Sequence, residues 1–435
     1  MSQQKQNGSV IAIVTMFFLY AMISFVTNLG APIGVIWKNQ PEIGGSNVLG
    51  IMGNFMNFFA YLFMGIPAGK MLTKVGYKKT ALIGIAVGFF GVLIQYLSGF
   101  SGGIPGFCIY LLGAFISGFA VCILNTVVNP MLNLLGGGGN RGNQLNMIGG
   151  TLNSLAGTMT PMLVGALIGT VTASTKMANV NLVMYIAMAV FACAFIILTF
   201  IPIEDPEAAR VTSETKFEHS PWSFRHLKLG VIAIFVYVGV EVGIPGGLNF
   251  YLSDPTDRGA GLIENAATIG GAVAAMYWLL MLIGRLCSSF IAAKVSARQL
   301  MMATTTIGMI LIIAAMLLPN TTTVNMPLFD IMKFKVTYAT VPVSALLLVL
   351  CGLCTSVMWT SIFNLSTEGL GKYTAQASGI FMMMVVGGGV LPVIQNFFAD
   401  KMGYMPSYFV YLLAMAYMFY YALIGCKNVN KDIPV

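Results

Sequence analysis

The chain has 435 residues, of which 57% are hydrophobic and only 8% are charged, and its mean hydropathy is +0.84. No soluble domain has an interior large enough for so much apolar surface, and the long apolar stretches do not alternate as those of a membrane β-barrel do. The composition therefore excludes both classes and predicts an all-α polytopic membrane protein.

A helix needs roughly 20 residues to cross a bilayer, and twelve apolar stretches of that length follow one another along the chain. The first stretch has no small-residue cleavage site, so we expect it to be retained. We predict membrane helices centred near residues 20, 58, 89, 120, 155, 190, 241, 278, 308, 350, 385 and 415.

Lysine and arginine are divided unevenly between the connections, which alternate between the two sides of the membrane. One side receives the basic residues of 203–228 together with Lys70, Lys74, Lys78, Lys79, Arg141, Lys294, Arg298 and Lys372. The other side receives only Lys38, Lys176, Arg258, Lys333, Lys335 and Lys401. Because basic connections stay in the cytoplasm, both termini are predicted to be cytoplasmic. The net charge of +8 reflects this asymmetry and gives no reason to expect nucleic acid as a partner.

Asparagines recur in the first half at spacings that place them on single helix faces. They are Asn28, Asn54, Asn57, Asn125, Asn129, Asn133, Asn146 and Asn153. An amide in an apolar helix is costly unless it faces water, a ligand or a neighbouring helix, so each of them alone could simply bond two helices together. Their concentration around Cys122–Pro161, with no Asp or Glu between Ile43 and Ile203, favours a neutral polar cavity. Such a cavity suits an uncharged, hydroxyl-rich ligand.

Residues 203–228 are the only long charged run between apolar stretches. We interpret this run as a cytoplasmic linker between an N-terminal six-helix half, 1–202, and a C-terminal six-helix half, 229–435. The halves look related, since KVGYK after the second predicted helix corresponds to KVSAR after the eighth. Two homologous halves around a site at mid-membrane are typical of secondary transporters.

The second half carries one deep carboxylate, Glu241, in the same predicted helix as Asn249. An intramembrane carboxylate is a functional candidate by default, although Glu241 could also be structural, either protonated or paired with Arg285. We expect Arg285 to anchor the inner end of its own helix. In the tenth predicted helix, Trp359 and Asn364 are candidates for contact with the ligand, because a Trp ring can stack on the apolar face of a sugar.

The sequence contains no recognisable catalytic cluster. Both histidines, His219 and His226, fall in the linker, and the CxxC of Cys351 and Cys354 lies inside an apolar stretch, where cysteine is most often filler. The phosphate-binding pattern GxxxxGK[ST] is absent. We therefore expect a protein that is not an enzyme and that holds no resident metal or cofactor.

The segments NTVVNPMLNLLG, LNMIGGTLNS, IPAGKMLTKVGYKK and SIFNLSTEGLGKYTAQASGIFMMMVVGGGVLPV resemble the fucose permease branch of the major facilitator superfamily. The resemblance covers nearly the whole chain. It implies the twelve-helix major facilitator fold, alternating access, and uptake of hexose-type sugars with a cation across a bacterial inner membrane. It also implies that Asn153, at the position of the family's sugar-binding Asn, contacts the sugar.

The chain departs from this pattern at three positions. The resemblance puts an Asp of the fucose permease at Asn28, a Glu at Asn125 and a Gln at Gly150. The two acids are the permease's proton-linked pair, and an amide can bond a sugar but cannot change charge. If a carboxylate couples transport here, we expect it to be Glu241, a residue type that the glucose and galactose members of the branch share.

We therefore predict secondary active uptake of a neutral monosaccharide, of glucose or galactose type before fucose, with H⁺ or Na⁺ as the coupling ion at Glu241. Our candidate sugar-binding residues are Asn28, Asn54, Asn57, Asn125, Asn129, Asn153, Asn249, Trp359 and Asn364. The alternatives are a passive sugar uniporter, a major facilitator exporter of another small solute and a membrane sensor, for which the chain offers little output domain. The expected partners are the sugar and membrane lipid, and the expected oligomeric state is a monomer.

Overall fold

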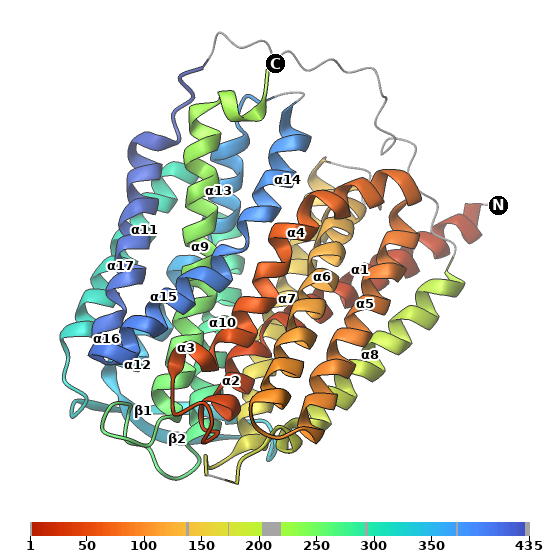
Figure 1. Ribbon diagram of the computed structural model, residues 1–435. Helices are drawn as coiled ribbons and strands as arrows, with labels where there is room; N and C mark the ends of the chain where they lie inside the picture. Colours follow the sequence, from red (N-terminus) through yellow and green to blue (C-terminus); the bar gives the residue numbers. More distant parts are fainter. Residues whose placement is uncertain are drawn as a thin grey trace.

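The computed structural model describes residues 2–135, 139–172, 174–201, 219–291, 295–370 and 373–430 (Figure 1). Among these residues, eleven helical segments are long and apolar enough to cross a membrane, and α4 is a further helix of 24 residues. The prediction of an all-α polytopic membrane protein is thus confirmed. The boundary predicted at 203–228 falls mostly outside the described residues and stays a prediction.

The helices before the linker are α1 (Ser2–Thr27), α2 (Gly30–Lys38), α3 (Asn47–Gly50), α4 (Met52–Val75), α5 (Tyr77–Leu97), α6 (Gly103–Leu135), α7 (Gly139–Ile168) and α8 (Asn181–Phe200). Those after it are α9 (Arg225–Ser253), α10 (Ala266–Ile291), α11 (Ala297–Leu317), α12 (Val343–Thr355), α13 (Met358–Thr367), α14 (Thr374–Met384), α15 (Gly387–Met402), α16 (Tyr404–Ser407) and α17 (Phe409–Tyr420). Single turns of other helix types are η1 (Ser98–Phe100), η2 (Met177–Val180), η4 (Pro221–Ser223) and η6 (Tyr421–Gly425).

The helices form two groups that lie side by side. In the first, α6 packs on α4 and α5, α1 packs on α7, and α5 packs on α8; in the second, α9 packs on α15, and α12 packs on α10 and α11. The groups meet along two seams, where α7 packs on α10 and where α4 packs on α14 and α15. In Figure 1 the red-to-yellow group lies to the right of the green-to-blue group.

Glycines allow the backbones to approach closely at the seam between α7 and α10. A Cβ on Gly271 would lie 2.2 Å from the carbonyl oxygen of Pro161, and one on Gly165 would lie 2.4 Å from that of Ala267. Small residues of this kind are common where membrane helices cross, since lipid provides no hydrophobic force to bring helices together. The seam therefore holds the two groups together by close packing.

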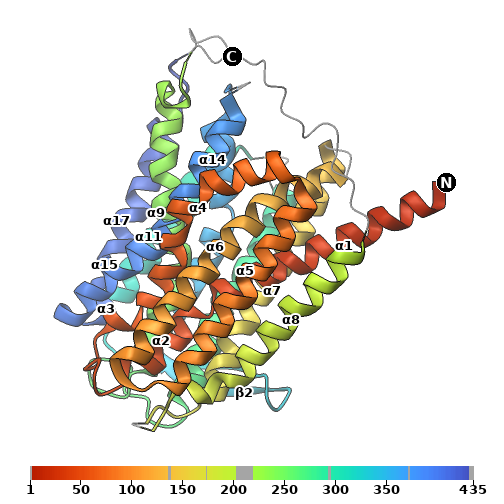
Figure 2. The ribbon, with the colours of Figure 1, turned by 45° about the vertical axis from the view of Figure 1, so that its right-hand side comes forward.

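A β-hairpin connects α11 to α12, and the sequence analysis did not anticipate it. Strand β1 (Thr323–Asp330) pairs antiparallel with β2 (Lys335–Pro342). The hairpin lies at the end of the bundle opposite the two chain termini (Figure 2). We call these two ends of the bundle the hairpin end and the termini end.

Candidate functional site

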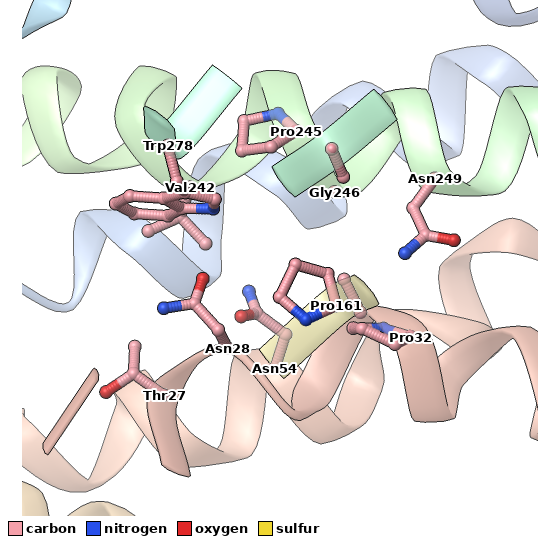
Figure 3. A pocket seen from close by; sticks show the side chains of 12 residues that line it. Thr27, Asn28, Pro32, Asn54, Pro161, Val242, Pro245, Gly246, Asn249 and Trp278 are labelled. Carbon is pink, nitrogen blue, oxygen red and sulfur yellow. The ribbon is translucent and has the colours of Figure 1, made fainter. Parts of the chain in front are cut away.

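A small cavity lies between the two groups of helices at the centre of the bundle (Figure 3). Its lining residues come from α1, α2, α4 and α7 on one side and from α9 and α10 on the other: Thr27, Asn28, Ala31, Pro32, Asn54, Pro161, Val242, Pro245, Gly246, Asn249, Ala274 and Trp278. The cavity volume of ≈ 20 Å³ is enough for about one water molecule. Anything larger requires the two groups of helices to move apart.

Prolines leave backbone acceptors near this cavity. Pro161 lies inside α7 and Pro245 lies inside α9, and neither has an N–H group to bond the carbonyl four residues earlier. The carbonyls concerned are those of Gly157 and Glu241. Such exposed backbone groups in a membrane helix are tolerated where they face a polar cavity.

Three predicted site residues line the cavity, Asn28 and Asn54 from one group of helices and Asn249 from the other (Figure 3). Asn28 Nδ2 donates to the carbonyl of Ser24 at 2.9 Å, and Asn54 Nδ2 donates across to the carbonyl of Gly388 at 2.9 Å. Asn249 is only 2% exposed; its Oδ1 accepts from Ser253 Oγ at 3.2 Å, whereas its Nδ2 has no partner. A buried donor without a partner costs about 1–3 kcal/mol, so Asn249 is prepared to bond a ligand that enters the cavity.

A second group of amides lies toward the termini end. Asn129 Oδ1 accepts from the hydroxyl of Tyr20, and Asn129 Nδ2 donates to the carbonyl of Asn125 at 3.1 Å. Asn153 Nδ2 donates to the carbonyl of Tyr20 at 3.1 Å, and Asn125 Nδ2 donates to Tyr61 Oη at 2.8 Å. These amides therefore join helices, which is the structural role that the sequence analysis gave as the alternative to contact with a ligand. Asn125, Asn129 and Asn153 are nevertheless only half-buried, which leaves part of each accessible to a ligand.

Gly157 places Asn153 next to the central cavity. It lies one turn after Asn153 on α7, and a Cβ added to it would lie 3.3 Å from the Trp278 ring and 3.4 Å from Asn28 Nδ2. The absence of a side chain at Gly157 thus lets α7 approach two of the cavity's lining residues. Asn153 is thus one helical turn from the part of α7 that contacts the cavity's lining residues.

Glu241 lies in an ion pair at the centre of the bundle. Its Oε1 accepts from Tyr237 Oη at 2.8 Å and from Arg285 Nη2 at 3.2 Å. Arg285 Nη1 also donates to Ser154 Oγ at 2.9 Å, so the pair extends from α9 through α10 to α7. Trp359 is half-buried, with its ring 6.2 Å from that of Tyr237. The indole therefore lies next to the tyrosine that donates to the paired carboxylate.

The hairpin end is closed by a network between the two groups of helices, which we call the hairpin-end network: Lys38, Asn47, Asp254, Asp400 and Tyr404. Lys38 Nζ lies 2.8 Å from Asp254 Oδ2, and the Tyr404 hydroxyl lies within hydrogen-bonding distance of both Asp254 and Asn47. The Asp400 carboxylate accepts from the backbone N–H groups of Asn47 at 2.9 Å and Val48 at 3.2 Å. Burial opposes ionisation of Asp254, but Lys38 and Thr256 outweigh it, and the pKa of this carboxyl lies below its ordinary value.

Comparison with known proteins identifies the family. The sequence model of the Major Facilitator Superfamily matches residues 9–393. The chain belongs to that superfamily. It is thus a facilitator, a transporter rather than an enzyme, as predicted.

The similar facilitators support the fucose permease-like branch. A protein named glucose/galactose transporter from Brucella abortus is 29% identical over 434 residues, covering 98% of this chain and 96% of the relative. The L-fucose-proton symporter of Escherichia coli is 22% identical, covering 90% and 87%. A crystal structure of the facilitator FucP in the outward conformation has a TM-score of 0.66 at 19% identity, covering 96% of this chain and 99% of that chain, and it confirms the predicted fold.

Two predicted site residues of this facilitator lie away from the central cavity. Asn57 is buried against α6, where its Nδ2 lies 3.5 Å from the carbonyl of Ala114. Asn364 is exposed and lines a groove at the termini end with Arg298, Glu368 and Lys427. The side chains of Asn133 and Asn146 lie outside the described residues.

Sequence reasoning missed Trp278, which lines the cavity, because only its position in an apolar stretch was visible. Arg285 was expected to anchor the inner end of its own helix, with pairing to Glu241 as the alternative, and the structure shows the pair. The alternative could be read from the sequence because Glu241 and Arg285 are opposite charges in neighbouring apolar helices, and each lowers the cost of burying the other.

Proposed function

We propose that this facilitator transports a neutral hexose, of glucose or galactose type before fucose, through the central cavity by alternating access. The observation that carries the proposal is the unpartnered Nδ2 of Asn249, buried at the interface of the two groups of helices and facing Asn28 and Asn54. A sugar hydroxyl can accept from Nδ2, while the neighbouring amides and freed carbonyls offer further donors and acceptors.

The choice of sugar rests on the relatives and on the chemistry of the wall. The relatives named glucose/galactose transporters share more of the sequence than the L-fucose-proton symporter does. Asn28 and Asn125 supply amides and no acid, which suits an uncharged ligand. An exporter of apolar solutes would need a cavity without these amides.

The position of the cavity supports alternating access. It lies where α1, α2, α4 and α7 face α9 and α10, so separation of the two groups at either end would expose it. At the hairpin end, separation requires the ion pair of Lys38 with Asp254 to break. We propose that the protein lies in the inner membrane and that its termini end faces the cytoplasm, since Lys70, Lys74, Lys78 and Lys79 lie on that side.

We propose further that a cation couples to transport through Glu241. Because Arg285 bonds both Glu241 and Ser154, a change in the charge of Glu241 would alter the contact between α10 and α7. A ligand can shift a conformational equilibrium only if it binds the two states differently. H⁺ or Na⁺ would do so if Arg285 bonds Glu241 and Ser154 in one state and not in the other. The same ion pair favours a second candidate, a passive hexose uniporter, in which Glu241 and Arg285 only stabilise the fold.

Uptake into proteoliposomes tests both candidates. Purified protein is supplied with a panel of labelled glucose, galactose, fucose and a pentose, and pH and Na⁺ gradients are imposed separately. We expect glucose or galactose to accumulate above equilibrium with one of the gradients. Equilibration without accumulation would select the uniporter, and transport of none of the sugars would contradict the proposed function.

A further inference from the structure

The hairpin formed by β1 and β2 has one buried face and one outward face. Met326, 3% exposed, and Leu328 alternate with exposed residues along β1, and the two strands pack on α10 and α12. On the opposite face, the register pairs Phe329 with Val336 and Pro327 with Tyr338. The inner face therefore fixes the hairpin to the bundle, while the outward face remains uncovered.

The outward face is apolar only near the turn. Its root carries Thr323, Asn325 and Thr340, whereas its distal part carries Phe329, Val336 and Tyr338, and the turn adds Met332 and Phe334. Tyr338 is 69% exposed and Phe334 is 83% exposed. We call Phe329, Met332, Phe334, Val336 and Tyr338 the apolar tip.

The backbone conformation of Phe334 is a second unusual feature of the apolar tip. Its φ is +49°, in the left-handed region that Gly or Asn occupies with far less strain at such a hairpin position. A bulky aromatic residue there is unfavourable for the backbone and, in water, unfavourable for its exposed ring. Both penalties are explained if the ring of Phe334 contacts an apolar phase.

Lipid is the apolar phase that continues onto the tip. Leu317, 79% exposed, ends α11 a few residues before β1, and Ile263 is exposed just before α10, on which β1 packs. These side chains extend the lipid-facing surface of the helices to the hairpin. Figure 2 shows the turn next to β2 reaching sideways beyond the helices, rather than straight away from the bundle. Lys333 and Lys335 flank Phe334, as basic residues flank membrane-anchoring rings at the headgroup level.

We propose that the apolar tip is an interfacial anchor, which inserts into the headgroup and upper acyl region of the leaflet at the hairpin end. Tyr338 places its ring in the apolar layer and its hydroxyl among the headgroups, while Lys333 and Lys335 contact lipid phosphates. Because the inner face packs on α10 and α12, the anchor fixes the membrane depth of the second group of helices. This proposal is independent of the transported solute.

The test is photocrosslinking of the full chain in liposomes of phosphatidylethanolamine and phosphatidylglycerol. A benzophenone amino acid replaces Phe334 in one variant and Asn325 in a matched control, which is exposed on the same outward face but among the polar root residues. Illumination followed by mass spectrometry should give about tenfold more lipid adduct at position 334, because only the tip reaches the acyl region. Neither substitution removes a buried contact, so both variants should fold.

Three results would overturn the anchor. Equal lipid adducts at positions 334 and 325 would mean that the tip has no special contact with lipid. Adducts at 334 to a second copy of the chain would assign the tip to a protein interface. Absence of any adduct at 334 would mean that the tip stays in water. As a second readout, Phe334→Gly removes the ring while suiting the left-handed backbone, and it should raise amide hydrogen exchange at Val336 and Tyr338 of the full chain in liposomes.

Discussion

The amide of Asn249 is half satisfied: Ser253 Oγ bonds its Oδ1 at 3.2 Å, and nothing bonds its Nδ2. In the hexose-bound protein, a sugar hydroxyl would accept from this nitrogen. We predict that Asn249→Ala weakens glucose or galactose binding by about 1–3 kcal/mol, the cost of losing a buried hydrogen bond. Equilibrium binding of labelled sugar to the purified variant measures this loss.

Asn396→Ala is the matched control for Asn249→Ala. Asn396 is equally buried in the second group of helices, but its Nδ2 bonds the carbonyl of Pro392 at 2.8 Å and it does not line the cavity. We expect this variant to keep the parent's affinity. Equal losses in the two variants would mean that Asn249 acts through folding and not through contact with the sugar.

Glu241 and Arg285 form the ionic centre of the second group of helices. Glu241→Gln keeps a hydrogen-bonding side chain of the same size next to Tyr237 and Arg285 but removes the charge. We predict that this variant still exchanges labelled hexose down its gradient and no longer concentrates it, because the neutral amide cannot take up a proton and lacks the negative charge that would attract Na⁺.

The readout for Glu241→Gln is the ratio of uphill accumulation to downhill exchange in the same proteoliposomes. A merely structural role would lower both activities together, since removing one partner of a buried pair destabilises the protein by about 3–5 kcal/mol. Accumulation at the parent's level would show that the coupling ion binds elsewhere or is absent.

At the scale of elements, α2, α3, α9, α15 and α16 meet in the hairpin-end network. The Lys38 and Asp254 side chains are only 8% and 12% exposed, so their ion pair is shielded from solvent. We predict that Asp254→Asn shifts the protein toward a state open at the hairpin end, since it leaves Lys38 buried without its counter-charge. Spin labels at Lys176 and Lys401, both exposed on opposite groups of helices, should report a longer distance by pulsed electron resonance.

The effect of pH on this closure has a definite sign. Since the pKa of Asp254 is lowered in the closed state, the ion pair's contribution is complete above the ordinary carboxyl pKa of about 4. It is lost only as the pH falls through the lowered value, so acidification from pH 6 to about pH 5, still above the ordinary carboxyl pKa, should not open the hairpin end. Asp330→Asn, which removes the pair of Asp330 with the exposed Lys333 on the hairpin, should leave the spin-label distance unchanged. If the spin-label distance in Asp254→Asn equals the parent's, the ion pair does not hold the hairpin end closed.

For the whole molecule, composition and the length of the apolar stretches were enough to predict the helices and the membrane, because lipid tolerates few backbone structures. Polar residues inside those stretches, such as Asn28, Asn54, Asn249 and Glu241, could be identified as site candidates because polar groups are costly in lipid. Their positions on a helix face do not reveal which of them share a cavity. Asn57 and Asn54 are three residues apart, yet only Asn54 lines it.

Apart from the pairing of Glu241 with Arg285, which was one of the alternatives, contacts between distant segments were not predicted. The hairpin-end network joins Lys38 to Asp254 across 216 positions of sequence, and nothing local in either residue's surroundings indicates the partner. The hairpin was missed because Pro327 is unusual within a strand and because the outward positions Phe329, Val336 and Tyr338 are as apolar as the inward ones.

The central claim is that a hexose crosses by way of the cavity between the two groups of helices, which open alternately. The most direct test is counterflow of labelled glucose and galactose in proteoliposomes containing the Lys38→Cys/Asp254→Cys double variant, before and after bridging the two thiols with a short cleavable crosslinker. The single Lys38→Cys variant controls for reaction at the native cysteines. We predict saturable counterflow in the unbridged protein, its loss on bridging and its recovery on cleavage. Counterflow that persists in the bridged protein, or absence of hexose counterflow before bridging, would contradict the account.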